Sequence, residues 1–165
     1  MADEVDAIVA AWRSESPELD VSPMQVLSRV SRLARHLDLA RRQAFAAHDL
    51  EVWEFDVLAA LRREGPPYEL SPGELTRQTL STSATMTNRI DRLEAKGLVE
   101  RQPNAADRRG VRVRLTAEGK TRVSEALADL LTAERTLLAS LEPAARTELA
   151  DSLRRLLVSF EGRRS

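Results

Sequence analysis

The stretch from Leu75 to Leu115 constrains this chain more than any other part of its sequence. It reads LTRQTLSTSATMTNRIDRLEAKGLVERQPNAADRRGVRVRL. These residues predict a short helix, a turn, a second helix rich in Thr, Asn and Arg, and a hairpin whose tip is Asp107-Arg108-Arg109-Gly110. This is the order of parts that places one helix in the DNA major groove and a basic loop beside it. We therefore expect a winged helix-turn-helix.

The same segment concentrates positive charge. It contains nine Lys or Arg residues and four acidic residues, so it carries +5, whereas the whole chain carries −1. The remaining residues therefore carry −6. A near-neutral chain that gathers its basic residues in one segment is typical of a protein that binds a polyanion.

The composition excludes several classes of chemistry. At 165 residues the chain is expected to form a single domain, 1–165. It has no cysteine, which excludes disulfides, thiolate nucleophiles and Cys-ligated zinc. The two histidines, His36 and His48, have no pattern of carboxylates around them, so we expect surface histidines and no metal site. No nucleophile with a base in reach can be identified, so we expect neither an enzyme nor a cofactor.

The sequence also bears on location. No apolar run approaches the roughly 18–20 residues that a membrane span needs. The start, Met1-Ala2-Asp3-Glu4, is acidic and lacks the basic region of a signal peptide. We expect a cytoplasmic protein with no membrane partner.

The spacing of apolar residues predicts a chain that is helical almost throughout, with one hairpin. Val5, Ile8, Val9 and Trp12 predict a short amphipathic helix, and Ser22-Pro23 predicts the N-cap and first turn of a second helix that runs to about residue 47. We expect further helices over 52–64, 73–79 and 82–96, an extended piece over 68–71, strands over 98–102 and 111–115, and long helices that begin at residues 116 and 143.

The terminal helices carry an excess of apolar residues. The last two have leucine stripes, and the second helix has an apolar inner side that includes Val26, Leu27, Val30 and Leu33. A chain of this length cannot bury all of them, so we expect a homodimer whose helices 3–48 and 116–162 intertwine with those of the partner. The winged helix-turn-helix then forms a lobe over 50–115. The opposite face of the second helix is basic, and either solvation or contact with the DNA backbone explains it.

The helix over 82–96 has three sides at about 100° per residue. Met86, Ile90 and Leu93 point to the core. A second, acid-free stripe contains Thr85, Asn88, Arg92 and Lys96. This segregation favours DNA contact over a solvated face. We expect Ser81, Thr82 and Ser83 to bond phosphate at the N-terminal end, and Asn88, Arg89 and Arg92 to approach base edges.

The hairpin tip has a second basic element. Asp107 precedes Arg109 by two residues and can orient its guanidinium, which leaves Arg108 free at the tip. An arginine on a narrow loop suits the negative potential of the minor groove. An ion pair without DNA contact is the alternative.

At these residues the chain resembles the MarR family of winged-helix bacterial transcriptional regulators. The motif DRRGVRVRLTAEGK following GLVERQPNAA carries the resemblance, which extends over about 26–141. It implies an obligate dimer on pseudo-palindromic promoter DNA, which usually acts as a repressor and is released by a small aromatic or acidic effector.

An extra N-terminal helix with a tryptophan is similar to the urate-responsive branch of that family. This resemblance implies an effector set of Trp12, Asp56, Arg89 and Arg101. Glu64 stands where that branch often carries an asparagine. Related regulators with most of this set respond to small carboxylates such as citrate or aconitate, so urate and these carboxylates are both candidate effectors.

The residues around Asp56 support a pocket independently. Its helical neighbours are apolar or small, and a carboxylate in such a setting needs a cation. Arg89 lies between the core stripe and the DNA stripe, so we expect it to face inward and pair with Asp56. A ligand anion that competes for Arg89 would then tilt the DNA-reading helix. A purely structural ion pair, with Trp12 as a packing residue, is the alternative.

One other class of function fits a winged helix. Such a domain can serve as a protein–protein interaction module without sequence-specific DNA binding. Salt dependence separates the two, because phosphate neutralisation makes DNA binding fall steeply with salt.

Overall fold

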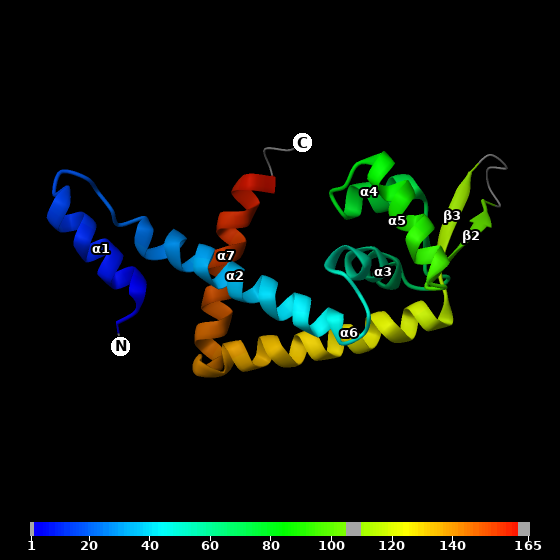
Figure 1. Ribbon diagram of the computed structural model, residues 1–165. Coiled ribbons are helices and arrows are strands. Elements are labelled where there is room, and N and C mark those ends of the chain that lie inside the picture. Colours follow the sequence, from blue (N-terminus) through cyan, green and yellow to red (C-terminus); the bar gives the residue numbers. More distant parts are fainter. Residues whose placement is uncertain (1, 105–109, 162–165) are drawn as a thin grey trace.

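The computed structural model describes residues 2–104 and 110–161 (Figure 1). The elements in chain order are α1 (Glu4–Glu15), α2 (Met24–Ala46), α3 (Val52–Glu64), β1 (Glu69–Leu70), α4 (Pro72–Gln78), α5 (Ser83–Ala95), β2 (Val99–Pro103), β3 (Val111–Leu115), α6 (Ala117–Leu137), the short 3-10 helix η1 (Leu138–Ser140) and α7 (Pro143–Glu161). The expected fold class is confirmed: the chain is mainly helical and contains a winged helix-turn-helix. None of the helices in the described ranges is long and apolar enough to cross a membrane.

Local capping explains where most of the helices begin. Ser71 caps α4 through a capping box with Glu74, and the hydroxyl of Thr116 accepts the backbone N–H of Gly119 at 3.0 Å to cap α6. The expected cap at Ser22 is wrong. Pro23 occupies the N-cap position of α2 and no side chain caps that helix, while the backbone N–H of Ser22 donates to Asp20 in the preceding turn at 2.9 Å.

The sheet has one strand more than the single hairpin that the sequence predicts. The strand order is β1-β3-β2, all antiparallel, with Leu70 opposite Val113 and Arg101 also opposite Val113 on the other side. β1 has only two residues, so it is too short to show the alternation by which strands are recognised. Its pairing attaches the wing to the connection between α3 and α4.

One continuous core holds the winged-helix lobe to the adjacent parts of α2 and α6. Phe45 of α2 stacks on Phe55 of α3 with ring centroids 3.9 Å apart. Leu58, Leu61 and Leu75 are fully buried in the same cluster. The lobe therefore shares its interior with Phe45 of α2 and with Val123, Ala126 and Leu130 of α6.

Gly119 sets how closely α6 approaches the wing. A Cβ at this position would lie 2.1 Å from the carbonyl oxygen of Leu98, a distance that no side chain tolerates. The first turn of α6 therefore rests directly on the backbone just before β2. This contact fixes the wing relative to the long helix.

The terminal helices are organised differently. α1 packs on the start of α2 through a small separate cluster of Val5, Val9 and Val21. α7 turns away from α6 and projects from the body of the chain (Figure 1). No side chain described in α7 is buried.

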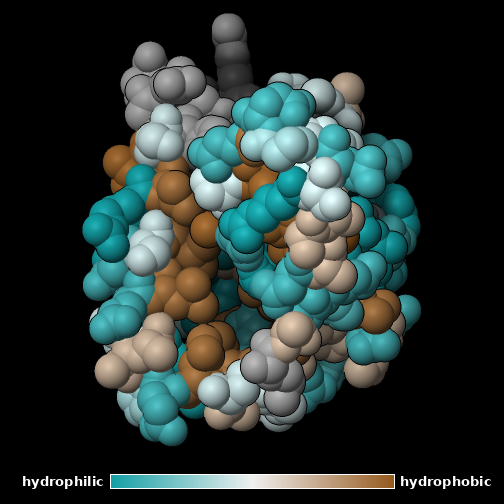
Figure 2. Space-filling view, turned by 90° about the vertical axis from the view of Figure 1, so that its left-hand side faces the viewer, coloured by the Kyte–Doolittle hydropathy of each residue, from teal (hydrophilic) through white to brown (hydrophobic). Residues whose placement is uncertain are grey.

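A broad apolar surface results from this arrangement. Within one chain, the predicted inner stripe of α2 is uncovered: Val26, Leu27, Val30 and Leu33 are between 41% and 57% exposed. Figure 2 shows apolar side chains gathered at the end of the molecule where α1 and α7 lie. We call this surface the terminal apolar face; its exposed members also include Leu127, Leu131, Leu137, Leu138, Leu149, Leu156, Leu157 and Val158.

Candidate nucleic-acid interface and the adjoining pocket

One side of helix α5 is buried in the lobe core, and the opposite side is exposed to solvent. Met86, Ile90 and Leu93 are essentially inaccessible and anchor the helix in the lobe core, as the sequence predicts. Thr82 is the N-cap, and its hydroxyl oxygen accepts the backbone N–H of Thr85 at 3.3 Å. The outer face of a rigidly anchored helix is the part of this fold that can enter a groove.

The polar residues at the N-terminal end of α5 divide into two groups. Ser83 and Asn88 are exposed, and no hydrogen bond of their side chains to another described residue is recorded. The hydroxyls of Thr82 and Thr85 bond to each other at 2.8 Å, and that of Ser81 lies 3.1 Å from the hydroxyl of Thr79. Ser83 and Asn88 are therefore the side chains most ready to take a new partner.

Arg92 and Lys96 turn toward the start of α3. Arg92 pairs with Glu51 at 2.7 Å and lies over the Trp53 ring, with 4.8 Å between its guanidinium carbon and the ring centroid. Lys96 donates to Glu54 at 3.0 Å and to the carbonyl oxygen of Asp49 at 3.1 Å. The stripe lacks acids on its own helix, but α3 and the turn before it supply them from outside.

Glu54 is the buried member of this contact. Its side chain has no exposed surface, and its Oε2 accepts both Lys96 and the backbone N–H of Glu51. Its Oε1 has no hydrogen-bond partner in the described part of the chain. A buried carboxylate is stable only when a cation accompanies it, so Lys96 ties the C-terminal end of α5 to α3.

Arg101 clamps the wing to the same end of α5. Its guanidinium bonds Asp91 and Glu94, and its backbone N–H donates to Glu94 at 3.1 Å. These contacts, with the bond to Asp91 foremost, raise the pKa of Arg101 above its already high ordinary value. Arg101 therefore stays charged and acts here as a tie between β2 and α5.

The other wing arginines are also engaged. Arg112 lies 2.9 Å from Glu74, and Arg114 lies 2.9 Å from Glu69. The residues at the wing tip that the sequence singles out, Asp107, Arg108 and Arg109, fall outside the described residues.

These ion pairs reduce the positive charge that the basic segment 75–115 has available for a ligand. The structure describes seven of its nine cations, and five of those seven (Arg92, Lys96, Arg101, Arg112 and Arg114) form ion pairs, four of them with acids from residues before the segment. The lobe 50–115 contains eleven Lys or Arg residues and ten acids, so it is close to neutral as a whole. Available positive charge is therefore confined to a few side chains such as Arg89.

A pocket of about 550 Å³ adjoins the inner side of α5. We call it the Arg89 pocket; it is lined by Arg42, Leu50, Glu51, Val52, Trp53, Asp56 and Arg89. It lies where the end of α2, the start of α3 and the middle of α5 meet. Its volume lies within the range of small-molecule sites.

The expected Asp56–Arg89 ion pair is wrong. Asp56 pairs with Arg41 of α2 at 2.8 Å, because the basic face of α2 lies against this side of α3. Arg89 instead lies over Trp53, with 5.4 Å between its guanidinium carbon and the ring centroid. Both residues nevertheless line the same pocket.

The acidic side chains of the Arg89 pocket have ion-pair partners, whereas its arginines have none among the described residues. Its two acids, Glu51 and Asp56, are already paired with Arg92 and Arg41. Neither Arg42 nor Arg89 forms an ion pair with any residue that the structure describes. The pocket therefore has two guanidinium groups without carboxylate partners, which favours an anionic ligand.

The other two residues of the expected effector set lie elsewhere in the chain. Trp12 is half-exposed on α1, at the far end of α2 from the Arg89 pocket (Figure 1). Arg101 is held in the wing clamp. Within one chain, the structure brings together Asp56 and Arg89 but not Trp12 or Arg101.

Sequence reasoning missed Glu51 and Trp53. Glu51 is the N-cap of α3 and Trp53 lies in its first turn, and both contact arginines of α5 directly. The signal was present in the run DLEVWEFD at 49–56, where four acids in eight residues face a basic helix that follows later in the chain.

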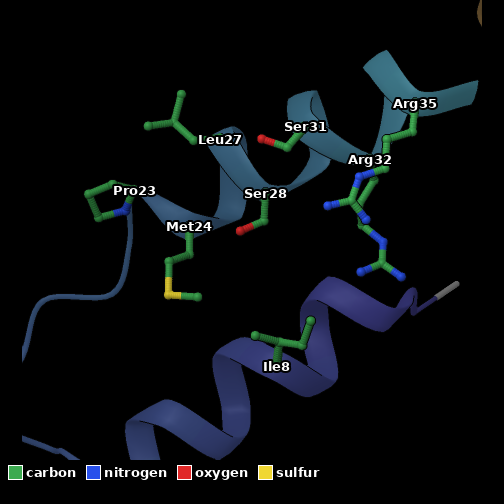
Figure 3. A pocket seen from close by; sticks show the side chains of 8 residues that line it. All are labelled: Ile8, Pro23, Met24, Leu27, Ser28, Ser31, Arg32 and Arg35. Carbon is green, nitrogen blue, oxygen red and sulfur yellow. The ribbon is translucent and has the colours of Figure 1, made fainter. Parts of the chain in front are cut away.

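A second hollow lies between α1 and α2 (Figure 3). It has a volume of about 450 Å³, an apolar part formed by Ile8, Met24 and Leu27, and two arginines, Arg32 and Arg35, at one end. Arg32 pairs with Glu4 of α1. This hollow touches no element of the winged helix, so it is separate from the DNA-reading surface.

Comparison with known proteins agrees with the geometry. A model described as the MarR family matches residues 48–110. The HTH-type transcriptional regulator PecS of Dickeya dadantii is 38% identical over 153 residues, which are 93% of this chain and 92% of PecS. The HTH-type transcriptional repressor NicR of Pseudomonas putida is 30% identical over 151 residues, which are 88% of this chain and 93% of NicR.

A solved structure gives the same result in three dimensions. Bordetella bronchiseptica BpsR, whose DNA binding is regulated by 6-hydroxynicotinic acid, superposes with a TM-score of 0.68 at 28% identity. The match covers 84% of this chain and 96% of BpsR.

Proposed function

The chain belongs to the MarR family of DNA-binding transcriptional regulators, and from that premise we propose that it is a dimeric repressor released by a small anionic effector. The observation that carries the proposal is the placement of Arg89. This side chain belongs to the helix that reads DNA and also lines a pocket with unpaired cationic charge. A single residue can therefore be shared between the DNA-bound and effector-bound states.

On DNA, α5 enters the major groove with its exposed N-terminal half. Ser81, Thr82, Ser83 and Thr85 bond phosphate, while Asn88, Arg89 and Arg92 approach base edges. Arg108 and Arg109 contact the adjacent minor groove. Arg92 is paired with Glu51, and Arg89 lines the pocket. Both side chains must therefore reorient when the protein binds DNA.

The terminal apolar face supports the dimer. Many apolar side chains of α2, α6 and α7 are about half exposed within one chain, and a partner surface would remove them from water. A second copy supplies a matching face through twofold symmetry, and it places two α5 helices about one turn of DNA apart, roughly 34 Å, on a pseudo-palindrome.

The effector we propose is a small anion with a flat or carboxylate-rich shape. Urate meets this description, and so do citrate and aconitate. The unpaired guanidinium groups of Arg42 and Arg89 supply charge, and the Trp53 ring supplies a flat wall. The regulation of BpsR by 6-hydroxynicotinic acid, an aromatic acid, supports this class.

Trp12 and Arg101 can reach the Arg89 pocket only if a second chain is present or if the wing contacts of Arg101 change. Because α1 lies at the far end of α2, a Trp12 that contacts the effector must come from the partner chain of the dimer. Arg101 must leave Asp91 and Glu94 to reach the pocket. The Arg89 pocket in one chain is therefore the first part of the site, and the dimer completes it.

DNA binding is tested by salt dependence. A duplex selected by the protein from a random pool is titrated at several salt concentrations. We expect log K to fall linearly with log salt, with a slope of about −0.9 for each phosphate neutralised. Replacing Arg108 and Arg109 together with Ala should lower affinity for every duplex and flatten the slope, whereas Asn88→Ala should change base preference. A flat plot would indicate a protein–protein module instead.

Effector binding is tested by thermal shift with urate, citrate and aconitate. We expect one of them to stabilise the parent protein, and Asp56→Asn and Arg89→Gln to reduce the shift. Arg35→Gln is the matched control, because Arg35 lines the separate hollow between α1 and α2. A shift that survives in Arg89→Gln and disappears in Arg35→Gln would place the effector in that hollow.

A further inference from the structure

Glu51, Trp53 and Arg92 form a closed triangle at the start of α3. The indole Nε1–H of Trp53 donates to Oε2 of Glu51 at 2.6 Å. The other carboxylate oxygen, Oε1, accepts from the Arg92 guanidinium at 2.7 Å. The triangle closes because Arg92 also lies over the Trp53 ring at 4.8 Å.

The same ring holds a second arginine of the recognition helix. Arg89 lies 5.4 Å from the Trp53 centroid and makes no ion pair with the described residues. Guanidinium groups are attracted to the face of an indole ring, so Trp53 is a platform for both. The two arginines of α5 that are suited to base contact are thus held against α3.

Glu51 is charged under ordinary conditions. The hydrogen bond from Trp53 is the main cause that lowers the pKa of Glu51, and the bond from Arg92 adds to it. The carboxylate is therefore ionised at neutral pH. One of its oxygens accepts from the Arg92 guanidinium and the other accepts from the Trp53 indole, so Arg92 is held by an anionic oxygen, the type of acceptor that a DNA phosphate also offers.

We propose that Glu51 is an internal competitor of DNA: its carboxylate and the Trp53 ring retain Arg92 and Arg89 on α3, and DNA binds by displacing Arg92 from Glu51. The inference rests on the proposed DNA-binding function and adds the residue that sets its strength. Exchange of one anion for another yields little net affinity. DNA that offers only phosphates is therefore disfavoured, and base contacts must supply the rest.

The exposure of the pair argues against a mainly structural role. The side chains of Arg92 and Glu51 are 50% and 55% exposed, and ion pairs this exposed contribute little to folding. Replacing Glu51 by Gln keeps an oxygen for the Trp53 N–H, removes the charge and turns the acceptor that faces Arg92 into an amide group that donates. Glu51 is also the N-cap residue of α3, where an amide oxygen can still accept, so folding should change little while DNA affinity changes.

The test is a double-mutant cycle on DNA binding. A duplex selected by the parent protein and an unrelated duplex are titrated with the parent, Glu51→Gln, Arg92→Gln and the double variant. We expect Glu51→Gln to tighten binding to both duplexes by about two- to fivefold for each recognition helix, the range of an exposed ion pair. The gain should disappear when Arg92 is already Gln, because Glu51 and DNA then have no guanidinium at position 92 to compete for.

Glu100→Gln is the matched control for charge. Glu100 is exposed on β2 of the same lobe and forms no ion pair with the described residues, so its removal changes net charge equally. A gain in Glu100→Gln as large as that in Glu51→Gln, or a Glu51→Gln gain that persists without Arg92, would overturn the proposal. Failure of the parent to bind any duplex would instead overturn the proposed function.

Trp53 emission provides a second readout of the displacement. In a Trp12→Phe background Trp53 is the one remaining tryptophan. We expect saturating DNA to alter its emission as the arginines leave the ring. Identical emission with and without DNA would contradict the displacement of Arg92.

Discussion

The winged-helix lobe and the terminal helices are both rich in leucine, yet they bury it in different ways. Leu58, Leu61 and Leu75 of the lobe are fully buried within the chain. Leu156 and Leu157 of α7 are 46% and 57% exposed. The lobe therefore buries its leucines within the chain, in a core that it shares with parts of α2 and α6, whereas these leucines of α7 lie at the surface, where the proposed dimer would cover them.

The ion pairs of the lobe and of the terminal helices also differ in what they connect. In the lobe, cations of α5 and the wing pair with acids from α3, β1 and α4, so the pairs connect elements that are distant in sequence. In the terminal helices, Arg29 of α2 holds Asp3 and Asp6 at the start of α1. The lobe pairs position a DNA-reading helix, and the terminal pairs hold one helix on another.

The largest expected effect concerns the terminal apolar face. Replacing Leu156 and Leu157 together with Asp should convert the proposed dimer to monomer, because a twofold interface loses each contact twice. The two leucines of each chain are about half exposed, so covering them contributes about 3–6 kcal/mol of association free energy in total. Light scattering measures the mass, and the control is Ser152→Asp, an exposed polar position on α7. A dimer that persists in the double variant would place the interface elsewhere.

The second prediction concerns the buried carboxylate of the lobe. Lys96→Ala leaves Glu54 in the interior without a cation, and this should lower the free energy of unfolding by about 3–5 kcal/mol. Urea denaturation measures this change in the free energy of unfolding. Adding Glu54→Gln to that variant should recover much of the loss, since the amide carries no charge. Lys120→Ala, which removes a lysine whose ammonium group contacts only Tyr68, should have a much smaller effect.

The smallest effect is expected where α1 joins α2. The hydrogen bond from Arg29 lowers the pKa of Asp3, and a backbone hydrogen bond followed by Arg29 lowers the pKa of Asp6, both from 3.8. A lowered pKa stabilises the docked helix above pH 3.8, and that contribution disappears as the pH falls through the lowered values. Trp12 emission in a Trp53→Phe variant should report release of α1 below about pH 4. Arg29→Gln should reduce this pH dependence without abolishing it, because the backbone hydrogen bonds that also lower the pKa of Asp3 and Asp6 remain. An unchanged profile would show that Arg29 does not help to hold α1.

Much of the fold could be predicted because its signals are local. The boundaries of α3 at Val52 and Glu64, the caps at Ser71 and Thr116 and the buried stripe of α5 all depend on residues within a few positions of each other. The extended piece over 68–71 was predicted, but its place in the sheet was not, because the two residues of β1 become a strand only through pairing with β3. The cap at Ser22 was wrong because a competing turn at Asp20 takes its backbone N–H.

The site was predicted less completely, since its contacts join elements far apart in sequence. Asp56 does need a cation, as its neighbours indicate, but the cation is Arg41, fifteen residues earlier in the chain. Which of several nearby arginines reaches a carboxylate depends on how the helices cross, and no spacing rule contains that information.

The sequence by itself determined the winged helix-turn-helix, the anchored side of α5 and the apolar stripes of the terminal helices, because hydrophobic periodicity and capping act over short stretches. Only the tertiary structure decided which charges are available. It pairs five of the seven described cations of the basic segment with acids and leaves Arg89 between the Trp53 ring and the pocket. The physical reason is that an ion pair depends on a separation of a few ångströms in space, whatever the distance along the chain.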